Sequence, residues 1–151
     1  MRLTRYTDYA LRVLTHLAAH PDRLCSIAEI ARGYRISQNH LMKVVNDLAR
    51  EGFVDSVRGR GGGIRLARSP AQISLGAVVR HTEEGFDLVD CGDCVIAPAC
   101  GITGVLREAL GAFMAVLDRY TLDDLMRRRT DIAALLAGIS PLPSGERAGR
   151  A

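Results

Sequence analysis

The sequence has no run of about 18 consecutive apolar residues, the length that a membrane-spanning helix needs. Its N-terminal residues also lack the continuous apolar core of a secretory signal peptide. We therefore expect no membrane association and a cytoplasmic location, where thiols stay reduced. With 151 residues, the chain has room for one domain and one appended element.

The motifs of common enzyme classes are also missing. The sequence shows no Ser/His/Asp grouping and no paired-carboxylate motif, and the glycine-rich stretch 59–63 is not followed by the Gly-Lys-Ser/Thr of a nucleotide loop. His16 and His20 have the spacing of a helical zinc pair but lack the intervening glutamate of a metalloprotease. We interpret this pair as a solvated helix end and predict that the protein is not an enzyme.

Charge is distributed unevenly along the chain, although the net charge is only +3. Residues 1–70 hold 12 Lys and Arg against 6 Asp and Glu, whereas residues 71–126 hold 3 against 9. Phosphate contacts by Lys and Arg release counterions, so a basic half is suited to binding nucleic acid. The acidic middle would be a poor DNA surface.

Two helices are predicted at the start of the basic half. Residues 7–20 place apolar side chains at three- and four-residue spacing, which is typical of a helix with one buried face. Ser26 and Glu29 have the spacing of a capping box, which predicts a short helix over 27–32. Gly33 is expected to end that helix.

A third helix is predicted from Ser37, a natural cap, to Gly52. Two helices joined by a short turn that contains glycine form a helix-turn-helix, in which the second helix enters the major groove. Gln and Asn side chains can bond adenine, and Lys suits guanine or a phosphate. The predicted DNA contacts on this helix are Ser37, Gln38, Asn39, His40 and Lys43.

A β-hairpin wing is predicted after the third helix. Two short alternating segments, 53–57 and 64–68, flank a loop rich in glycine and arginine. Arginines on such a hairpin are well placed for phosphates or a narrow minor groove, and Arg58, Arg60 and Arg65 are the candidates. The fold class is thus expected to be mainly α, with a winged helix-turn-helix and a two-stranded β wing over 1–80.

Residues 81–126 are predicted to form a sensor region. A helix over 74–81 and an acidic connection lead to Cys91, Cys94 and Cys100. Three clustered thiolates can supply most ligands of an iron-sulfur cluster or a zinc ion, and the missing fourth ligand leaves the site open to another group. Cys25 stands alone before the second helix and is interpreted as a small buried hydrophobe.

A long apolar stripe follows from Gly101 to Tyr120. So small a domain has little room to bury such a helix, so pairing with a second copy is expected, and packing onto its own winged domain is the alternative. The segment 121–124 resembles a helix cap and predicts a short helix toward Arg127. In the remaining region, 127–151, another helical turn or two is predicted over 130–137. Residues 140–151 are predicted to be disordered.

The chain resembles the dimeric winged-helix iron-sulfur regulators, which include NsrR-type nitric-oxide-sensing repressors and IscR-type regulators. The likeness rests on residues 3–12, on the wing motif 57–63 and on Cys-Val-Ile-Ala-Pro-Ala-Cys at 94–100. The resemblance implies a homodimeric repressor in which Cys91, Cys94 and Cys100 hold a [4Fe-4S] cluster, with [2Fe-2S] as the alternative. It also implies that double-stranded operator DNA is released when nitric oxide damages the cluster.

The fourth ligand distinguishes the two types. The resemblance to the NsrR type implies that Asp8 reaches the partner chain's cluster and that Arg12 holds this carboxylate. IscR-type proteins use a histidine shortly after the third cysteine, and 102–109 contain none. A carboxylate in the first turn of a helix is also favoured by the helix dipole without any cluster, so this role for Asp8 stays open.

The spacing of the first two cysteines departs from this resemblance. Only Gly92 and Asp93 separate Cys91 from Cys94, where relatives usually have four or five residues. A C-x-x-C pair is competent for either iron-sulfur or zinc, so the type of centre is left open. An IscR-like sensor of cluster status or iron, and a zinc- or thiol-based redox regulator, therefore remain alternatives.

Overall fold

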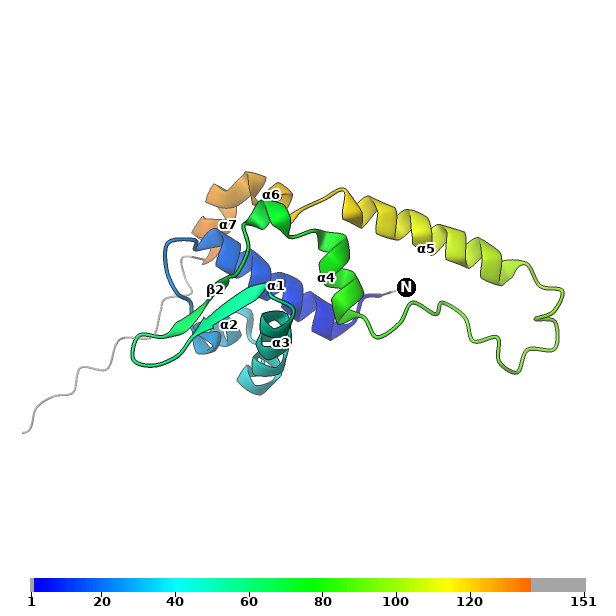
Figure 1. The fold of residues 1–151 in the computed structure, drawn as a ribbon, viewed down its shortest axis with the longest axis horizontal. Coiled ribbons are helices and arrows are strands. Elements are labelled where there is room, and N and C mark those ends of the chain that lie inside the picture. The colour runs from blue at the N-terminus through cyan, green and yellow to red at the C-terminus, as the bar shows by residue number, and fades with distance from the viewer. Residues whose placement is uncertain (1, 137–151) are drawn as a thin grey trace, which may run out of the picture.

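The computed structural model describes residues 2–136, and the predicted disordered tail lies outside this range. The winged half contains helices α1 (Arg5–Ala19), α2 (Ile27–Tyr34) and α3 (Gln38–Arg50) and strands β1 (Val54–Val57) and β2 (Gly63–Leu66) (Figure 1). The second half contains η1 (Pro70–Gln72), α4 (Leu75–Thr82), α5 (Ile102–Asp118), α6 (Leu122–Leu125), η2 (Met126–Arg128) and α7 (Arg129–Leu136). The predicted mainly helical class with a two-stranded wing is confirmed.

One hydrophobic core holds the winged half together. Helix α1 lies at its centre and contacts α3, α4, α6 and β2. The largest fully buried apolar side chains come from α1, α2, α3, β2, α6 and the segment before α4: Leu14, Ile30, Leu41, Leu48, Ile64, Ile73 and Leu122. Because Leu122 of α6 packs into the same cluster, the chain returns to the winged half after α5.

The end of α2 differs from its prediction. Gly33 lies inside the helix, which continues to Tyr34 and ends at Arg35 with a left-handed backbone, φ 55°. The amide of Ile36 then donates to the carbonyl of Ala31 at 2.8 Å, and Ile36 is buried. Burial of Ile36 and this closing bond outweigh the weak helix propensity of glycine. Ser37 occupies the N-cap position of α3 as expected, but its side chain makes no capping bond.

The wing is an antiparallel hairpin in which Val54 pairs with Leu66 and Val57 pairs with Gly63. Gly59 and Gly61 at its tip have φ values of 100° and 77°, which only glycine adopts without strain. The base of the wing is anchored to the body, since Cys25 exchanges two backbone hydrogen bonds with Ile64, at 3.0 and 2.8 Å. The wing is therefore tied to the segment between α1 and α2.

Helix α5 projects from the body of the molecule. The long loop that precedes it runs from α4 out to the far end of α5, where the helix begins (Figure 1). Its junction with α4 is a bidentate ion pair in which Arg80 donates to Asp118 at 2.7 and 2.6 Å. A side chain at Gly76 would collide with the Asp118 carboxylate, so glycine permits this approach. Only Met114 of α5 is buried.

One apolar face of α5 is left uncovered by the described residues. Ile102, Val105 and Val116 lie along it and are 45%, 62% and 44% exposed. We call these three residues the outer stripe. In the described chain α5 contacts its own domain through α4, and this stripe stays exposed. Among residues 2–136, no helix is both long and apolar enough to cross a membrane.

Candidate functional site

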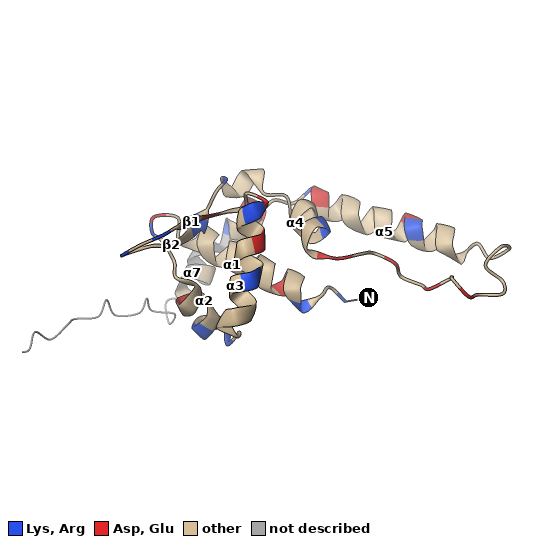
Figure 2. Ribbon diagram, turned by 60° about the horizontal axis from the view of Figure 1, so that its bottom comes forward, with Lys and Arg blue, Asp and Glu red and all other residues tan. Residues whose placement is uncertain are grey.

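The predicted DNA contacts all lie at the surface, on α3 and the wing. Every one of them is exposed: Ser37, Gln38, Asn39, His40, Lys43, Arg58, Arg60 and Arg65. Figure 2 shows Lys and Arg residues on α3 and the wing, whereas acidic residues follow the loop between α4 and α5. The charge asymmetry of the sequence is thus a spatial separation in the folded chain, and only the α3 and wing side suits a polyanion.

Helix α3 is held in place by buried side chains and by a polar contact. Leu41, Val44 and Leu48 are buried against the core. The Tyr6 hydroxyl of α1 donates to the Asp47 carboxylate of α3 at 3.1 Å, and His81 Nε2 of α4 lies 3.0 Å from the same oxygen. Burial and this bond raise the pKa of Tyr6 to about 12. Helix α3 is therefore positioned by both α1 and α4.

The wing arginines differ in their surroundings. Arg58 and Arg60 lie at the exposed tip and have no ion-pair partner within the part of the chain that the structure describes. Arg65 Nε lies 3.6 Å from Asp55 Oδ2 on the paired strand. The tip therefore carries the positive charge that is freest to meet a phosphate.

The three clustered cysteines lie on the long loop between α4 and α5. Cys94 is exposed, Cys91 and Cys100 are half-buried, and all are free thiols. Cys91 Sγ lies 3.6 Å from Thr103 Oγ1 in the first turn of α5. The structure does not bring the three sulfur atoms all within 4.8 Å of one another, so the loop must close further before they could share one centre.

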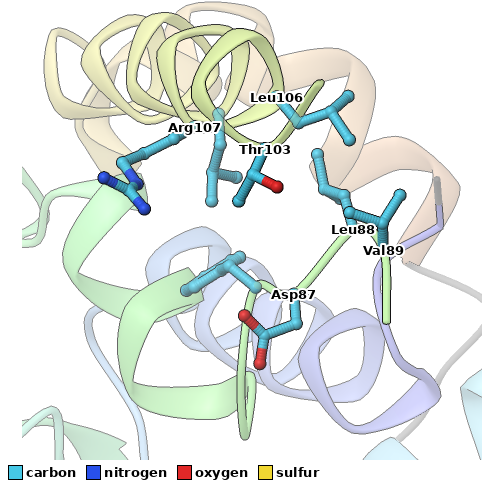
Figure 3. A pocket seen from close by; sticks show the side chains of 8 residues that line it. Asp87, Leu88, Val89, Thr103, Leu106 and Arg107 are labelled. Atoms are coloured by element: carbon cyan, nitrogen blue, oxygen red, sulfur yellow. The ribbon is translucent and has the colours of Figure 1, made fainter. Parts of the chain in front are cut away.

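The donor set nevertheless fits an iron-sulfur cluster. Residues on the loop and on the start of α5 line one pocket, including Leu88, Val89, Thr103 and Leu106 (Figure 3), so the loop and the helix face each other across it. Cys100 lies just before the N-terminus of α5, a helix of 17 residues. The positive end of the helix dipole at this N-terminus would stabilise an anionic thiolate centre. Thiolates are the ligands that such clusters require.

Asp8 and Arg12 form the contact that the resemblance implied. Arg12 donates from Nε to Asp8 Oδ1 at 3.0 Å, and its terminal nitrogen lies 2.9 Å from Oδ2. Both side chains are nearly half exposed on α1. Asp8 does not join the cysteines of its own chain in any group of ligand atoms among the described residues.

A polar network around Glu83 was not found by reading the sequence. The Glu83 carboxylate accepts from the Thr4 amide at 2.8 Å, from the Thr4 hydroxyl at 3.1 Å and from the Thr7 hydroxyl. Thr82 in turn donates to the buried Thr7 hydroxyl at 2.8 Å. These residues are about 75 to 79 positions apart in sequence, and no local pattern links them. The network joins the start of α1 to the start of the cysteine-bearing loop.

This network predicts a pH-dependent contribution to stability. Burial by itself would raise the pKa of Glu83, but the hydrogen bonds from Thr7 and Thr4 outweigh it and lower that pKa below 4.5. Ionised Glu83 therefore makes its full contribution to the free energy of unfolding above about pH 4.5. This contribution is lost as the pH falls through the folded-state pKa of Glu83. We expect Glu83→Gln to lower the Tm at pH 7 by roughly 2–4 °C, with the difference shrinking below about pH 4.

Thermal unfolding of the parent chain and of Glu83→Gln, at pH 7 and below about pH 4, measures this difference in Tm. Glu84→Gln is the matched control, because Glu84 is adjacent in sequence and exposed. Equal Tm values for the two variants at pH 7 would show that the network does not stabilise the fold.

The interpretation of His16 as part of a solvated helix end is wrong. His16 is fully buried, with Glu29 and Tyr34 of α2 against its ring, and only His20 remains half exposed. Burial lowers the pKa of His16 to about 4, so its imidazole is neutral near pH 7. Cys25 is buried, as predicted, and burial raises the pKa of its thiol to about 11.

Comparisons with known proteins agree with this architecture. Residues 3–128 match the Rrf2 family, described as iron-dependent transcriptional regulators. The chain is 54% identical to the HTH-type transcriptional regulator NsrR of Bacillus subtilis over 90% of its own length and 97% of the relative's. It is 48% identical to NsrR of Bacillus licheniformis over 91% of this chain and the whole of that protein.

Solved structures with the same fold include two regulators. T. potens IscR has a TM-score of 0.72 at 25% identity and covers 87% of this chain and 90% of its own. CymR, the global cysteine regulator of B. subtilis, has a TM-score of 0.69 at 28% identity and covers 83% of this chain and 95% of its own. With a winged fold and a family match over most of its length, the chain belongs to the Rrf2 family and is a transcriptional regulator, not an enzyme.

Proposed function

We propose that this regulator is a repressor that binds operator DNA as a homodimer while it holds an iron-sulfur cluster, and that nitric oxide releases it. The observation that carries the proposal is the Glu83 network, because it ties the loop with three free thiols to the helix that supports the recognition helix. The relatives named NsrR support the same function. The reduced thiols it needs fit a cytoplasmic protein.

Cys91, Cys94 and Cys100 are the proposed ligands from one chain, and Asp8 of the second chain is the fourth. When bound, a [4Fe-4S] or [2Fe-2S] cluster supplies iron that nitric oxide can attack. Arg12 contacts both oxygens of the Asp8 carboxylate and so keeps the carboxylate oriented. A carboxylate oxygen is more easily displaced from iron than a thiolate, so the Asp8 position is the proposed point of attack.

A second copy of the chain is the proposed cover for the outer stripe. A contiguous apolar face on a projecting helix is typical of an interface between subunits. Dimerisation through α5 would also place the loop of one chain against the partner, as a ligand from the partner requires. A dimer presents two recognition helices, which suits a pseudo-palindromic operator.

The chain offers a short route from ligand loss to DNA release. Asp8 directly follows Thr7 and lies one turn after Thr4, and both threonines bind Glu83. Tyr6, two residues before Asp8, donates to Asp47 of α3. Displacement of Asp8 would free the first turn of α1 to shift, and Tyr6 would transmit that shift to the recognition helix. The proposed coupling between the cluster and α3 would pass only through residues that contact one another directly.

The function is tested by anaerobic purification. We expect coloured protein that contains iron and sulfide, binds an operator-length duplex and releases it during titration with nitric oxide. Absorption spectra, metal and sulfide analysis and a DNA-binding assay provide the three readouts. Colourless, iron-poor protein that binds the operator equally tightly would refute the proposal.

Replacing Asp8 tests its role as the fourth ligand. We expect Asp8→Ala to keep the three thiolate ligands but to change the absorption spectrum and to weaken operator binding by about tenfold or more, because coupling energies between sites are typically about 1–3 kcal/mol. Asp22→Ala is the control, since Asp22 is also an exposed carboxylate of the winged half. An unchanged spectrum and an unchanged nitric oxide response in Asp8→Ala would exclude a ligand role.

Replacing Arg58 tests the wing. Arg58→Ala should weaken operator binding and reduce the slope of log K against log salt concentration by about 0.9 for each phosphate that the variant no longer binds. Binding measured at several salt concentrations gives this slope. Arg107→Ala removes the same charge from α5 in the acidic half and should leave the slope unchanged. A slope in Arg58→Ala equal to that of the parent chain would rule out a phosphate contact.

A further inference from the structure

A second group of metal-type ligands lies in the winged half, away from the cysteine loop. His16 and His20 of α1 and Cys25 before α2 each present a ligand atom within 4.8 Å of the others. Within residues 2–136, no other set of three His, Cys, Asp or Glu side chains is so closely gathered. We propose that His16, His20 and Cys25 form a separate binding site for a divalent transition-metal ion, with zinc as the best-suited ion.

The surroundings of His16 point to a missing ligand. Its side chain is fully buried, and neither ring nitrogen has a hydrogen-bond partner. Glu29 Oε1 lies 3.6 Å from His16 Nε2, which is just beyond hydrogen-bond length. Buried polar groups are almost always paired, so an unpaired imidazole inside a core calls for a partner. A metal ion beside His20 and Cys25 would supply it.

His20 is already oriented as a metal ligand would be. Its Nδ1 lies 2.8 Å from the carbonyl oxygen of His16, and since a carbonyl can only accept, this bond places the proton on Nδ1. The lone pair is then on Nε2. A histidine that donates one ring N–H to a backbone carbonyl and offers the other nitrogen is the usual arrangement at metal sites. His20 is half exposed, which gives an ion access from solvent.

Cys25 and Glu29 complete the surroundings. The two backbone bonds to Ile64 fix the position of Cys25. The Glu29 carboxylate is engaged by Arg23 at 2.7 Å and by the Ser26 amide at 3.1 Å, so it is placed to orient His16 and is not counted as a ligand. Three protein ligands leave a fourth position for water.

The geometry is close to that of a zinc site but must contract. With Zn–N and Zn–S bonds of about 2.1 and 2.3 Å, tetrahedral ligand atoms lie roughly 3.4–3.6 Å apart. The observed separations of up to 4.8 Å require a movement of about 1 Å, for which the two imidazoles, now stacked with ring centroids 4.5 Å apart, would have to rotate. Two nitrogens and one sulfur suit zinc better than magnesium or calcium. Binding would replace the thiol proton, which leaves to solvent.

A metal at this position would connect three parts of the DNA-binding half. His16 and His20 lie at the end of α1, and Cys25 lies in the segment just before α2. The backbone of Cys25 is hydrogen-bonded to Ile64 of β2 in the wing. Occupancy would fix the base of the wing relative to α1. This role is independent of the iron-sulfur cluster and of nitric oxide.

The test uses the full chain with Cys91, Cys94 and Cys100 replaced by serine, so that no loop thiol competes. Zinc chloride is titrated calorimetrically, and cobalt chloride is titrated by absorption spectroscopy. We expect one zinc ion per chain at roughly micromolar concentration or below, and a sulfur-to-cobalt absorption band. The band reports Cys25 directly, because Cys25 is the one cysteine left in this chain.

Variants of the same chain identify the ligands. His20→Gln and Cys25→Ala should each weaken zinc binding at least tenfold, whereas His40→Gln, an exposed histidine of α3, should not. His20 is half exposed, so its replacement leaves the core intact. Zinc affinity unchanged by either substitution, or a cobalt complex without the sulfur band, would overturn the proposal. Because this chain lacks the loop thiols, the result does not depend on the iron-sulfur cluster.

Discussion

The Cys94→Ser variant should contain almost no iron and should bind the operator about 100-fold or more weakly than the parent chain. Cys94 is the exposed member of the three loop cysteines, and a serine hydroxyl does not replace a thiolate as a ligand of iron. Without the proposed cluster, the cysteine loop of one chain and Asp8 on α1 of the second chain would no longer be joined through shared ligation. Specific operator binding typically exceeds non-specific binding by about 10³–10⁷, so a loss of this size is measurable.

Iron analysis and a DNA-binding titration measure both effects. Cys25→Ala is the control for loss of a thiol, because Cys25 is fully buried in the winged half and is not a proposed ligand of the cluster. It should retain the parent iron content. If Cys94→Ser kept iron and operator affinity, the cysteine loop would not be the site of the cluster.

Val105→Glu should convert the proposed dimer into a monomer. Val105 is the most exposed residue of the outer stripe, and the substitution would place a charge within the proposed interface. Burying an unpaired charge costs several kcal/mol, which is enough to weaken dimerisation by about 100-fold or more. Operator affinity should fall with it, since one recognition helix contacts only a half-site. Analytical ultracentrifugation measures the change in mass.

Gly111→Glu is the matched control on the same helix. Gly111 lies about 120° around the helix from Val105, and a side chain there meets open space. Glutamate also has a higher helix propensity than glycine, so the fold is not weakened. A dimer that survived Val105→Glu, or one disrupted equally by both variants, would mean that the outer stripe is not the interface.

Local signals in the sequence were sufficient for most of the helices and for the wing. The capping box of Ser26 and Glu29 is present in the structure, and so are the N-cap of α4 at Ser74 and the glycine-rich hairpin tip. The error at Gly33 arose because helix propensity is weak compared with tertiary packing, and burial of Ile36 decided where α2 ends. Boundaries depend on such contacts more than the existence of an element does.

The candidate site was predictable only in part. The residue types on α3 and the wing, and their exposure, follow from the apolar face that each element must bury. The sequence could not show that Glu83 binds Thr4 and Thr7, because hydrogen bonds between distant residues leave no local pattern. It also could not show that His16 is buried, since helical spacing does not reveal which neighbouring segment covers the end of α1.

The sequence by itself determined the order of elements, the basic and acidic halves, and the three thiols on one loop, because each of these depends on residues that are close together in the chain. Only the tertiary structure decided that α5 projects with an uncovered apolar face, and that His16, His20 and Cys25 meet inside the winged half. These features result from how the elements pack against one another, and packing is a collective property of the whole core.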